Sequence, residues 1–231
     1  MSLVVVTGSA SGIGAGCAAA LAADGHEIVE WDIAGDPSVN VADETAVAGA
    51  VAHLPGPIDG AVLAAGVSRM ARLVDTTTAD WDLQIGTNAF GVFNCLRALI
   101  PVTRRGGSIV VISSVGGLRS AAFLSAYCAS KSATIALVQA AAIELGPSGI
   151  RVNAVCPMYV RTAMEDREVG WEASLRGISP EEVTTGYIAG TPLGRIAQPA
   201  EIADVVRFLI GPQSRYVTGA SVTVSGGADL L

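Results

Sequence analysis

The feature that most constrains the fold is a glycine-rich turn between a buried strand and a helix. Leu3–Thr7 is an uninterrupted apolar run, which is typical of a strand buried on both faces. The turn follows at once as Thr7-Gly8-Ser9-Ala10-Ser11-Gly12-Ile13-Gly14, and the alanine-rich segment Gly12–Ala23 predicts a helix. Glycines permit a tight turn and leave the first helical N–H groups open to an anion. The pattern favours a dinucleotide-binding unit, and a plain tight turn is the alternative.

The alternation of strand and helix continues along the rest of the chain. Further strands are predicted at Ile28–Asp32, Ile58–Ala64, Ser108–Ile112, Ile150–Val155 and Ala220–Val224, and further helices at Glu44–His53, Trp81–Ile100, Ser125–Leu145 and Pro199–Ile210. Apolar strands that alternate with helices predict a parallel sheet covered by helices on both faces. There is no internal repeat, low-complexity tract or linker. Residues 1–231 are therefore predicted to form a single domain with a doubly wound α/β fold.

One segment, residues 161–190, interrupts this alternation. It is more polar than its surroundings, with the runs Glu165-Asp166-Arg167-Glu168 and Ser179-Pro180-Glu181-Glu182, yet it also carries Met164, Trp171, Leu175 and Tyr187. An amphipathic insertion of this length in a compact domain is often a substrate lid. A pair of helices packed on the surface is the alternative.

Charge and hydropathy patterning restrict the class of partner. The net charge of −7 argues against a nucleic-acid ligand, because phosphate binding needs clustered positive charge. The longest apolar stretches, such as Ala133–Ile143, are interrupted by polar residues and are too short to span a bilayer. The N-terminus has neither a basic start nor a small-residue cleavage site, so no secretory signal is expected. These features predict a cytoplasmic protein that binds a small molecule, and neither nucleic acid nor a membrane.

The four cysteines give no sign of a metal site or a disulfide framework. Cys17, Cys95, Cys128 and Cys156 form no CxxC pair and lie far in sequence from both histidines. Each stands in an apolar context, which favours buried free thiols.

The only lysine of the chain stands one helical turn from a tyrosine. Lys131 is accompanied elsewhere by thirteen arginines, which suggests that this position needs a compact ammonium. Tyr127 and Lys131 are four residues apart on a predicted helix and so share one face. A nearby ammonium stabilises a phenolate and lowers the phenol pKa, so that the phenol can exchange a proton with an alkoxide. Ser113 and Ser114 end the preceding strand, at the edge where open α/β sheets carry their reactive groups.

A carboxylate at the end of the second predicted strand bears on the choice of nucleotide. Asp32 follows Gly8 by twenty-four residues, and no arginine or lysine comes shortly after it. A carboxylate there accepts hydrogen bonds from the adenosine ribose hydroxyls and repels a 2′-phosphate. The sequence therefore favours NAD over NADP, and a carboxylate that merely caps a turn is the alternative.

Together these motifs resemble the short-chain dehydrogenase/reductase (SDR) family over essentially the whole chain. Thr7–Gly14 is similar to the family's TGxxxGIG turn, and Tyr127-Cys128-Ala129-Ser130-Lys131 looks like its YxxxK pair. Ser114 precedes Tyr127 by thirteen residues, which is the family's spacing for the substrate-orienting serine. Asn88 falls where the family has a helix asparagine that completes a proton relay. The resemblance implies a Rossmann-like fold.

The resemblance also implies roles for individual residues. Tyr127 would be the general acid/base, with Lys131, Ser114 and Asn88 as its catalytic partners, and Ser114, Leu118, Tyr127 and Met158 would contact the substrate. The residues expected to bind the cofactor are Gly8, Ser11, Gly12, Ile13, Gly14, Asp32, Asn40, Val41, Ala65, Gly66, Tyr127, Lys131, Pro157, Val160 and Thr162. No metal is expected. Family members commonly form homotetramers, so a homotetramer or a homodimer is expected here.

Three departures from the family pattern are visible. The family's NNAG motif is replaced by Leu63-Ala64-Ala65-Gly66, and its PG motif by Pro157-Met158. Only Ile33–Pro37 separates Asp32 from the short run Ser38–Val41, although a parallel crossover normally needs a dozen or more residues. The helix that usually follows Asp32 therefore looks deleted, and the adenine pocket is expected to be more open.

The reaction expected from this reading is hydride transfer between NAD(H) and a small or medium secondary alcohol or ketone. Largely apolar side chains are expected near the substrate: Val115, Leu118, Phe123, Met158, Tyr159, Met164, Trp171 and Tyr187. One alternative is an NADPH-dependent reductase of carrier-bound 3-oxoacyl chains. The other is a non-catalytic NAD-binding or NAD-sensing protein.

Overall fold

Parallel strands form one sheet in the computed structural model, which describes residues 2–230. Within that range the sheet has six strands in the order β2-β1-β3-β4-β5-β6. The strands are β1 (Leu3–Thr7), β2 (Glu27–Trp31), β3 (Ile58–Leu63), β4 (Thr103–Ile112), β5 (Arg151–Pro157) and β6 (Ser221–Val224). Every adjacent pair runs parallel. The predicted doubly wound α/β fold is confirmed.

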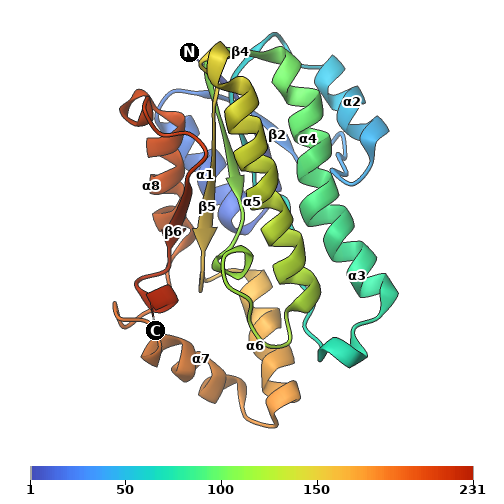
Figure 1. The fold of residues 1–231 in the computed structure, drawn as a ribbon, viewed down its shortest axis with the longest axis vertical. Coiled ribbons are helices and arrows are strands. Elements are labelled where there is room, and N and C mark those ends of the chain that lie inside the picture. The colour runs from blue at the N-terminus through green and yellow to red at the C-terminus, as the bar shows by residue number, and fades with distance from the viewer. Residues whose placement is uncertain (1, 231) are drawn as a thin grey trace.

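Helices cover both faces of this sheet (Figure 1). One face carries α1 (Gly12–Ala23) and α8 (Pro199–Ile210), and the other carries α2 (Glu44–Ala52), α3 (Thr78–Gln84), α4 (Gly91–Leu99) and α5 (Ser125–Leu145). Successive strand side chains point to opposite faces, so Val4 and Val6 pack toward α1 and α8 while Val5 packs toward α4 and α5. This double burial explains why the strands are continuous apolar runs.

The chain between Trp31 and Glu44 contains neither a helix nor a strand, which bears out the deletion inferred after Asp32. As a consequence, β2 pairs only with β1 and forms an edge of the sheet. Val39 and Val41 from this connection are nevertheless buried in the core beneath α2 and α4. The short segment thus contributes buried side chains to the core beside the sheet. It adds no strand to the sheet.

The helix predicted at Trp81–Ile100 is divided into pieces. It runs as α3, a π-helical turn over Ile85–Phe90, and α4, and a short 3-10 turn over Ile100–Val102 follows. A π-helical turn holds one residue more per hydrogen bond than an α-helix, and such turns are frequent at functional sites. The turn carries Asn88, which was selected from the sequence as a site residue.

The continuous stretch Thr78–Val102 has the length and apolar composition of a membrane-spanning helix, which the sequence analysis did not anticipate. Core helices of globular proteins share these properties. Here one side of the stretch packs into the core through Val92, Leu96 and Leu99, and it also buries the amide of Asn94. We therefore interpret it as a core helix of this fold.

Two further helices occupy residues 161–190. They are α6 (Ala163–Arg176) and α7 (Pro180–Ala189), and they lie beyond the carboxyl end of β5 (Figure 1). Val169, Ala173 and Val183 form a small apolar cluster between them, separate from the two clusters on the sheet. The pair is thus stabilised largely by its own contacts.

A buried arginine ties β5 to the end of α8 and gives a test of this architecture. Arg151 donates to the carbonyl groups of Leu209 (2.7 Å), Ile210 (3.3 Å) and Gly211 (3.1 Å) and to the hydroxyl of Ser214 (2.6 Å). Arg151→Met removes these four hydrogen bonds, while Ser108 and Ser214 still donate to the Leu209 carbonyl and Ser214 to that of Gly211. We expect the free energy of unfolding to fall by about 2–4 kcal/mol in urea denaturation.

The matched control for this prediction is Arg105→Met. Arg105 is exposed and makes one hydrogen bond, to the carbonyl of Pro147. Its substitution should change the free energy of unfolding by less than about 0.5 kcal/mol. Equal losses in the two variants would show that the Arg151 hydrogen bonds do not hold α8 on the sheet.

Candidate active site

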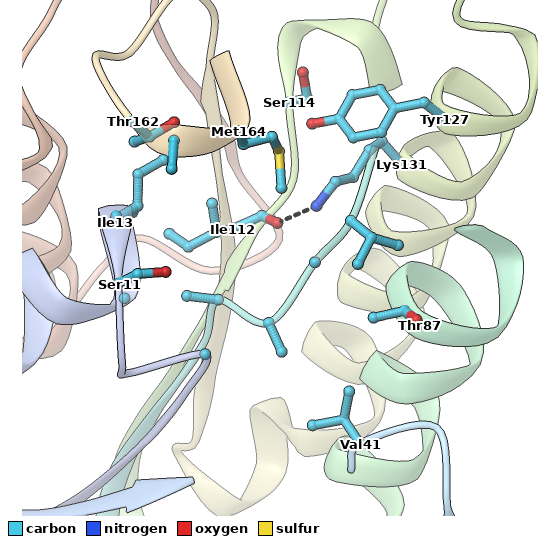
Figure 2. Close-up of a pocket in the computed structure, with 18 of the residues that line it drawn as sticks. Ser11, Ile13, Val41, Thr87, Ile112, Ser114, Tyr127, Lys131, Thr162 and Met164 are labelled. Carbon is cyan, nitrogen blue, oxygen red and sulfur yellow. Dashed lines mark hydrogen bonds between the residues drawn. The ribbon is translucent and has the colours of Figure 1, made fainter. Parts of the chain in front are cut away.

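A single cavity of about 570 Å³ lies at the carboxyl ends of the strands and joins the glycine turn to the Tyr127–Lys131 pair. Strand order reverses between β1 and β3, and open α/β sheets bind ligands at such a point. In Figure 2, Ser11, Ile13 and Thr162 lie on one side of the cavity and Tyr127 and Lys131 on the other.

Most residues selected from the sequence line this cavity. They are Gly8, Ser11, Gly12, Ile13, Gly14, Asp32, Asn40, Val41, Ala65, Gly66, Ser114, Tyr127, Lys131, Pro157, Met158, Val160 and Thr162. Asn88 and Leu118 do not line it, and Leu118 is exposed. Of the other side chains expected near the substrate, Met164 lines the cavity, whereas Val115, Phe123, Tyr159, Trp171 and Tyr187 do not.

The glycine turn is built for a close approach of backbones. Gly8 has φ +67°, and a Cβ there would lie 2.7 Å from the backbone of Ala65. A Cβ on Gly14 would lie 2.0 Å from the carbonyl oxygen of Gly8. Ser11 caps α1 without a side-chain hydrogen bond, so the first N–H groups of the helix stay open to an anion. The cradle therefore fits a pyrophosphate, as a dinucleotide requires.

Asp32 stands just beyond β2 on the wall of the cavity. Its carboxylate accepts from the backbone N–H groups of Ala10 (3.0 Å) and Ala34 (2.9 Å), which fix its orientation and leave lone pairs free on both oxygens. The cations among the lining residues are Lys131 and Arg167, which come from α5 and α6 and not from the segment after β2. The charge around Asp32 is therefore suited to ribose hydroxyls and not to a further phosphate.

Tyr127 and Lys131 project from the first two turns of α5. Lys131 is buried and Tyr127 is half-buried in the wall of the cavity, and Lys131 Nζ lies 5.7 Å from the centroid of the Tyr127 ring. Lys131 donates to the carbonyl of Ile112 at 2.9 Å, which holds the ammonium beside the end of β4 (Figure 2). The Tyr127 hydroxyl points toward Ser114, whose Oγ accepts from the backbone N–H of Gly116 at 3.0 Å.

Burial sets the proton affinities of this pair. It raises the pKa of Tyr127 well above its usual value, and the Glu168 carboxylate raises it further, while the Ser114 hydroxyl lowers it. Burial also lowers the pKa of Lys131 to about 8. The direction for Tyr127 is opposite to the one expected from a neighbouring ammonium, because desolvation of the phenolate is the largest influence on this pKa.

Asn88 holds the backbone next to the Tyr127–Lys131 pair through hydrogen bonds. Its side chain is fully buried, accepts from the backbone N–H of Val67 (2.8 Å), and donates to the carbonyl of Val67 (2.9 Å) and to Ser130 Oγ (2.9 Å). Ser130 Oγ in turn donates to the carbonyl of Tyr127 at 2.7 Å. The Asn88 amide thus links the segment after β3 to α5, and its hydrogen-bonding capacity is used within the protein.

The segment Leu63-Ala64-Ala65-Gly66, which lacks the two amide side chains of the family motif, is held by hydrogen bonds from other residues. Thr7 Oγ1 accepts from the backbone N–H groups of Ala64 (3.0 Å) and Ala65 (3.1 Å), and so joins the ends of β1 and β3. A Cβ on Gly66 would lie 3.3 Å from Asn88 Oδ1, which is a tight contact, so this glycine lets the backbone pass close to the Asn88 amide. These contacts keep the segment in place without the two amide side chains.

Two glutamates in the cavity wall, Glu165 and Glu168, were not selected from the sequence. They lie on α6, and burial raises the pKa of both carboxyl groups, to about 7 for Glu165. The sequence analysis treated residues 165–168 as part of a polar segment. The available signal was the spacing of Met164 and Glu168, which places the two side chains on one face of the helix.

Comparisons with known proteins agree with this geometry. A family model described as "Enoyl-(Acyl carrier protein) reductase" matches residues 8–229. The oxidoreductase UcpA of Salmonella typhimurium is 34% identical over 98% of this chain and 94% of its own. The 3-oxoacyl-[acyl-carrier-protein] reductase FabG of Thermotoga maritima is 34% identical over 96% of both chains.

Two other proteins extend the comparison. The 3-alpha-(or 20-beta)-hydroxysteroid dehydrogenase of Mycobacterium tuberculosis is 34% identical over 97% of this chain and 88% of its own. Among solved structures, levodione reductase superposes with a TM-score of 0.93 at 29% identity, over 99% of this chain and 98% of that one. The agreement in fold therefore extends over nearly the whole chain.

Proposed function

This chain belongs to the short-chain dehydrogenase/reductase family, whose members are oxidoreductases of alcohols and ketones, and we propose that it transfers hydride between NAD(H) and a small or medium secondary alcohol or ketone. One observation carries the proposal. The glycine turn, Asp32 and the Ser114–Tyr127–Lys131 group line one continuous cavity. A nucleotide and a carbonyl substrate can therefore meet within it.

The cofactor residues follow from the shape of that cavity. The open N-terminus of α1 and the turn Gly8–Gly14 would hold the pyrophosphate, and Asp32 would accept from the adenosine ribose. Val160 and Thr162 would hold the nicotinamide carboxamide, and Thr162 already lies against the turn, since its methyl group is 3.3 Å from a Cβ position on Gly12. The bound cofactor supplies the hydride acceptor or donor, which the protein itself lacks. Asn40, Val41, Ala65, Gly66 and Pro157 would complete the binding surface.

Proton transfer is assigned to Tyr127. During alcohol oxidation its phenolate takes the hydroxyl proton of the substrate, and during ketone reduction its phenol returns one. Ser114 holds the substrate oxygen beside the phenol. Lys131 stabilises the phenolate and binds the cofactor ribose. Asn88 supports the group through Ser130 and the backbone of Tyr127.

We assign the segment 161–190 as a lid on a single-domain protein. Met164, Glu165, Arg167 and Glu168 of α6 line the cavity, while α6 and α7 pack on a small cluster of their own. A segment with its own apolar contacts can shift relative to the sheet without exposing the main core.

A second candidate is a reductase of carrier-bound 3-oxoacyl chains, favoured by the 34% identity to FabG of Thermotoga maritima. The net charge of −7 offers little attraction to an acidic carrier, and Asp32 opposes the 2′-phosphate of NADPH. A third candidate is an NAD-binding protein without turnover. The presence of Ser114, Tyr127, Lys131 and Asn88 together speaks against it.

The deciding experiment is absorbance at 340 nm with NAD or NADP across secondary alcohols, diols, polyols and hydroxysteroids, with a 3-oxoacyl thioester and NAD(P)H as the reductive arm. We expect NAD-dependent turnover of at least one secondary alcohol. Asp32→Asn should reduce the ratio of kcat/KM with NAD to kcat/KM with NADP by about tenfold, because the repulsion of the 2′-phosphate is removed. Turnover of the thioester with NADPH alone would support the second candidate, and NAD binding without any turnover would support the third.

Tyr127→Phe tests the assigned proton donor. The ring and its packing remain while the hydroxyl is lost, so kcat should fall more than about a hundredfold while the dissociation constant of NADH, measured by fluorescence titration, changes less than about threefold. Lys131→Arg should also be severely impaired, because a planar guanidinium does not replace a compact ammonium at this position. A Tyr127→Phe variant that keeps more than a tenth of the activity would refute the role.

We also propose that the chain forms a homo-oligomer, a homotetramer in the first instance. Trp81, Phe90 and Phe93 expose much of their side chains along α3 and α4, as do Ile143 on α5 and Phe208 on α8. Exposed aromatic side chains in such number are typical of subunit contacts. Light scattering should give about four times the mass of the 23.3 kDa chain, and a monomeric mass would contradict the proposal.

A further inference from the structure

The cavity contains charged groups that the proposed reaction does not use, and Glu168 is one of them. Glu168 lies on α6, one helical turn beyond Met164, and lines the same cavity as Ser114, Tyr127 and Lys131. Arg167 and Glu165 also line it, but neither is among the groups that shift the pKa of Tyr127 or Lys131. Glu168 is the carboxylate whose charge bears on Tyr127 and on Lys131.

Glu168 is poorly supplied with hydrogen-bond donors from the protein. Its one hydroxyl neighbour is Ser68, whose buried Oγ lies close enough to favour the carboxylate but makes no hydrogen bond of normal geometry. A carboxylate can accept about four hydrogen bonds, and a buried one is destabilised when they are not made. Burial accordingly raises the pKa of Glu168. The carboxylate therefore has acceptor capacity to offer to a molecule in the cavity.

The segment after β3, which carries Ser68 beside Glu168, is joined to α6 by contacts of Arg69. Arg69 Nη1 donates to the carbonyl of Ser68 at 2.9 Å, and the Arg69 guanidinium stacks on the ring of Trp171 at 5.3 Å from its centroid. These contacts join the segment after β3 to α6. Ser68 and Glu168 are thus held beside each other, and Glu168 lines the cavity.

We propose that Glu168 is a specificity-determining residue that accepts a hydrogen bond from a second hydroxyl group of the substrate, so that the preferred substrates are diols, polyols or hydroxyketones. This inference rests on the proposed function. With the reacting oxygen between Ser114 and Tyr127, a hydroxyl elsewhere on the same small molecule would lie in the cavity whose wall includes Glu168.

A hydroxyl suits this position better than an ammonium or a carboxylate. Arg167 and Lys131 already face the negative charge of Glu168 and favour its ionised form. An added ammonium would stand in the same cavity as the Lys131 ammonium, whose pKa burial has already lowered. A carboxylate on the substrate would be repelled by Glu168. A neutral donor satisfies the acceptor without adding charge.

The test compares cyclohexanol with cyclohexane-1,2-, 1,3- and 1,4-diol, using NAD at 340 nm. We expect kcat/KM for the best diol to exceed that for cyclohexanol by at least about tenfold, mainly through a lower KM. Glu168→Gln should reduce this ratio, and Glu168→Leu should reduce it to about one. The amino alcohol 2-aminocyclohexanol is included to detect recognition of an ammonium.

Asp166→Asn is the matched control. Asp166 lies on the same helix, undergoes the same change of charge on substitution, is exposed and does not line the cavity, so the diol-to-cyclohexanol ratio should stay at the wild-type value. A second readout is independent of turnover. The dissociation constant of the best diol in the presence of NADH, measured by calorimetry, should rise about tenfold in Glu168→Leu, while thermal melting with NADH verifies that the variant is folded.

The outcomes separate this inference from the function on which it rests. A wild-type ratio near one, a ratio that Glu168→Leu leaves unchanged, or a preference for 2-aminocyclohexanol over every diol would overturn the inference while the dehydrogenase function stands. Absence of turnover with every alcohol would overturn both.

Discussion

In a parallel sheet buried on both faces, reactive groups can meet a ligand only at the ends of the strands. The rest of this structure depends on that constraint. Val4, Val5 and Val6 are fully buried, so no strand interior can carry a reactive group in contact with ligand. Glycines and polar residues instead follow the strand ends: Gly8 after β1, Gly66 after β3 and Ser114 after β4. Because the strands are parallel, their carboxyl ends all lie on the same side of the sheet. The cavity is the space between these carboxyl ends, α5 and α6.

The site is kept in shape by buried polar contacts, and not by the apolar core alone. Thr7 binds the segment after β3, Asn88 binds the backbone of Val67, and Lys131 binds the carbonyl of Ile112. Each of these polar groups is withdrawn from water, and leaving such a group unpaired costs about 1–3 kcal/mol. The network therefore has one favourable arrangement. It holds the phenol of Tyr127 at the cavity wall, while α6 adds Glu165 and Glu168 to the same wall.

Much of the fold and of the nucleotide end could be predicted because both depend on local pattern. Buried parallel strands require apolar runs, and a backbone turn with φ near +67° requires a glycine such as Gly8. Helices α1, α5 and α8 have the predicted bounds, since their ends are marked by residues within a few positions. The division of α3 from α4 was missed, because the π-helical turn is stabilised by tertiary contacts of the buried Asn88 and leaves no interruption in the apolar pattern.

The substrate end was predicted less well, for a physical reason. Trp171 and Tyr187 were expected at the substrate by their apolar character. The orientation of α6 and α7 directs them to other contacts, such as the stacking of Tyr187 on Tyr159 with ring centroids 4.0 Å apart. The same orientation brings Glu168 to the cavity from a segment that looked like polar surface.

The sequence by itself determined the sheet, the glycine cradle and the Tyr127–Lys131 pair, because each is set by residue type and short-range spacing. The tertiary structure alone decided which residues share one cavity, that desolvation raises the pKa of Tyr127, and that Glu168 lines the same cavity as Tyr127. Those properties arise from contacts and desolvation between segments far apart in the chain, on which a one-dimensional pattern carries little information.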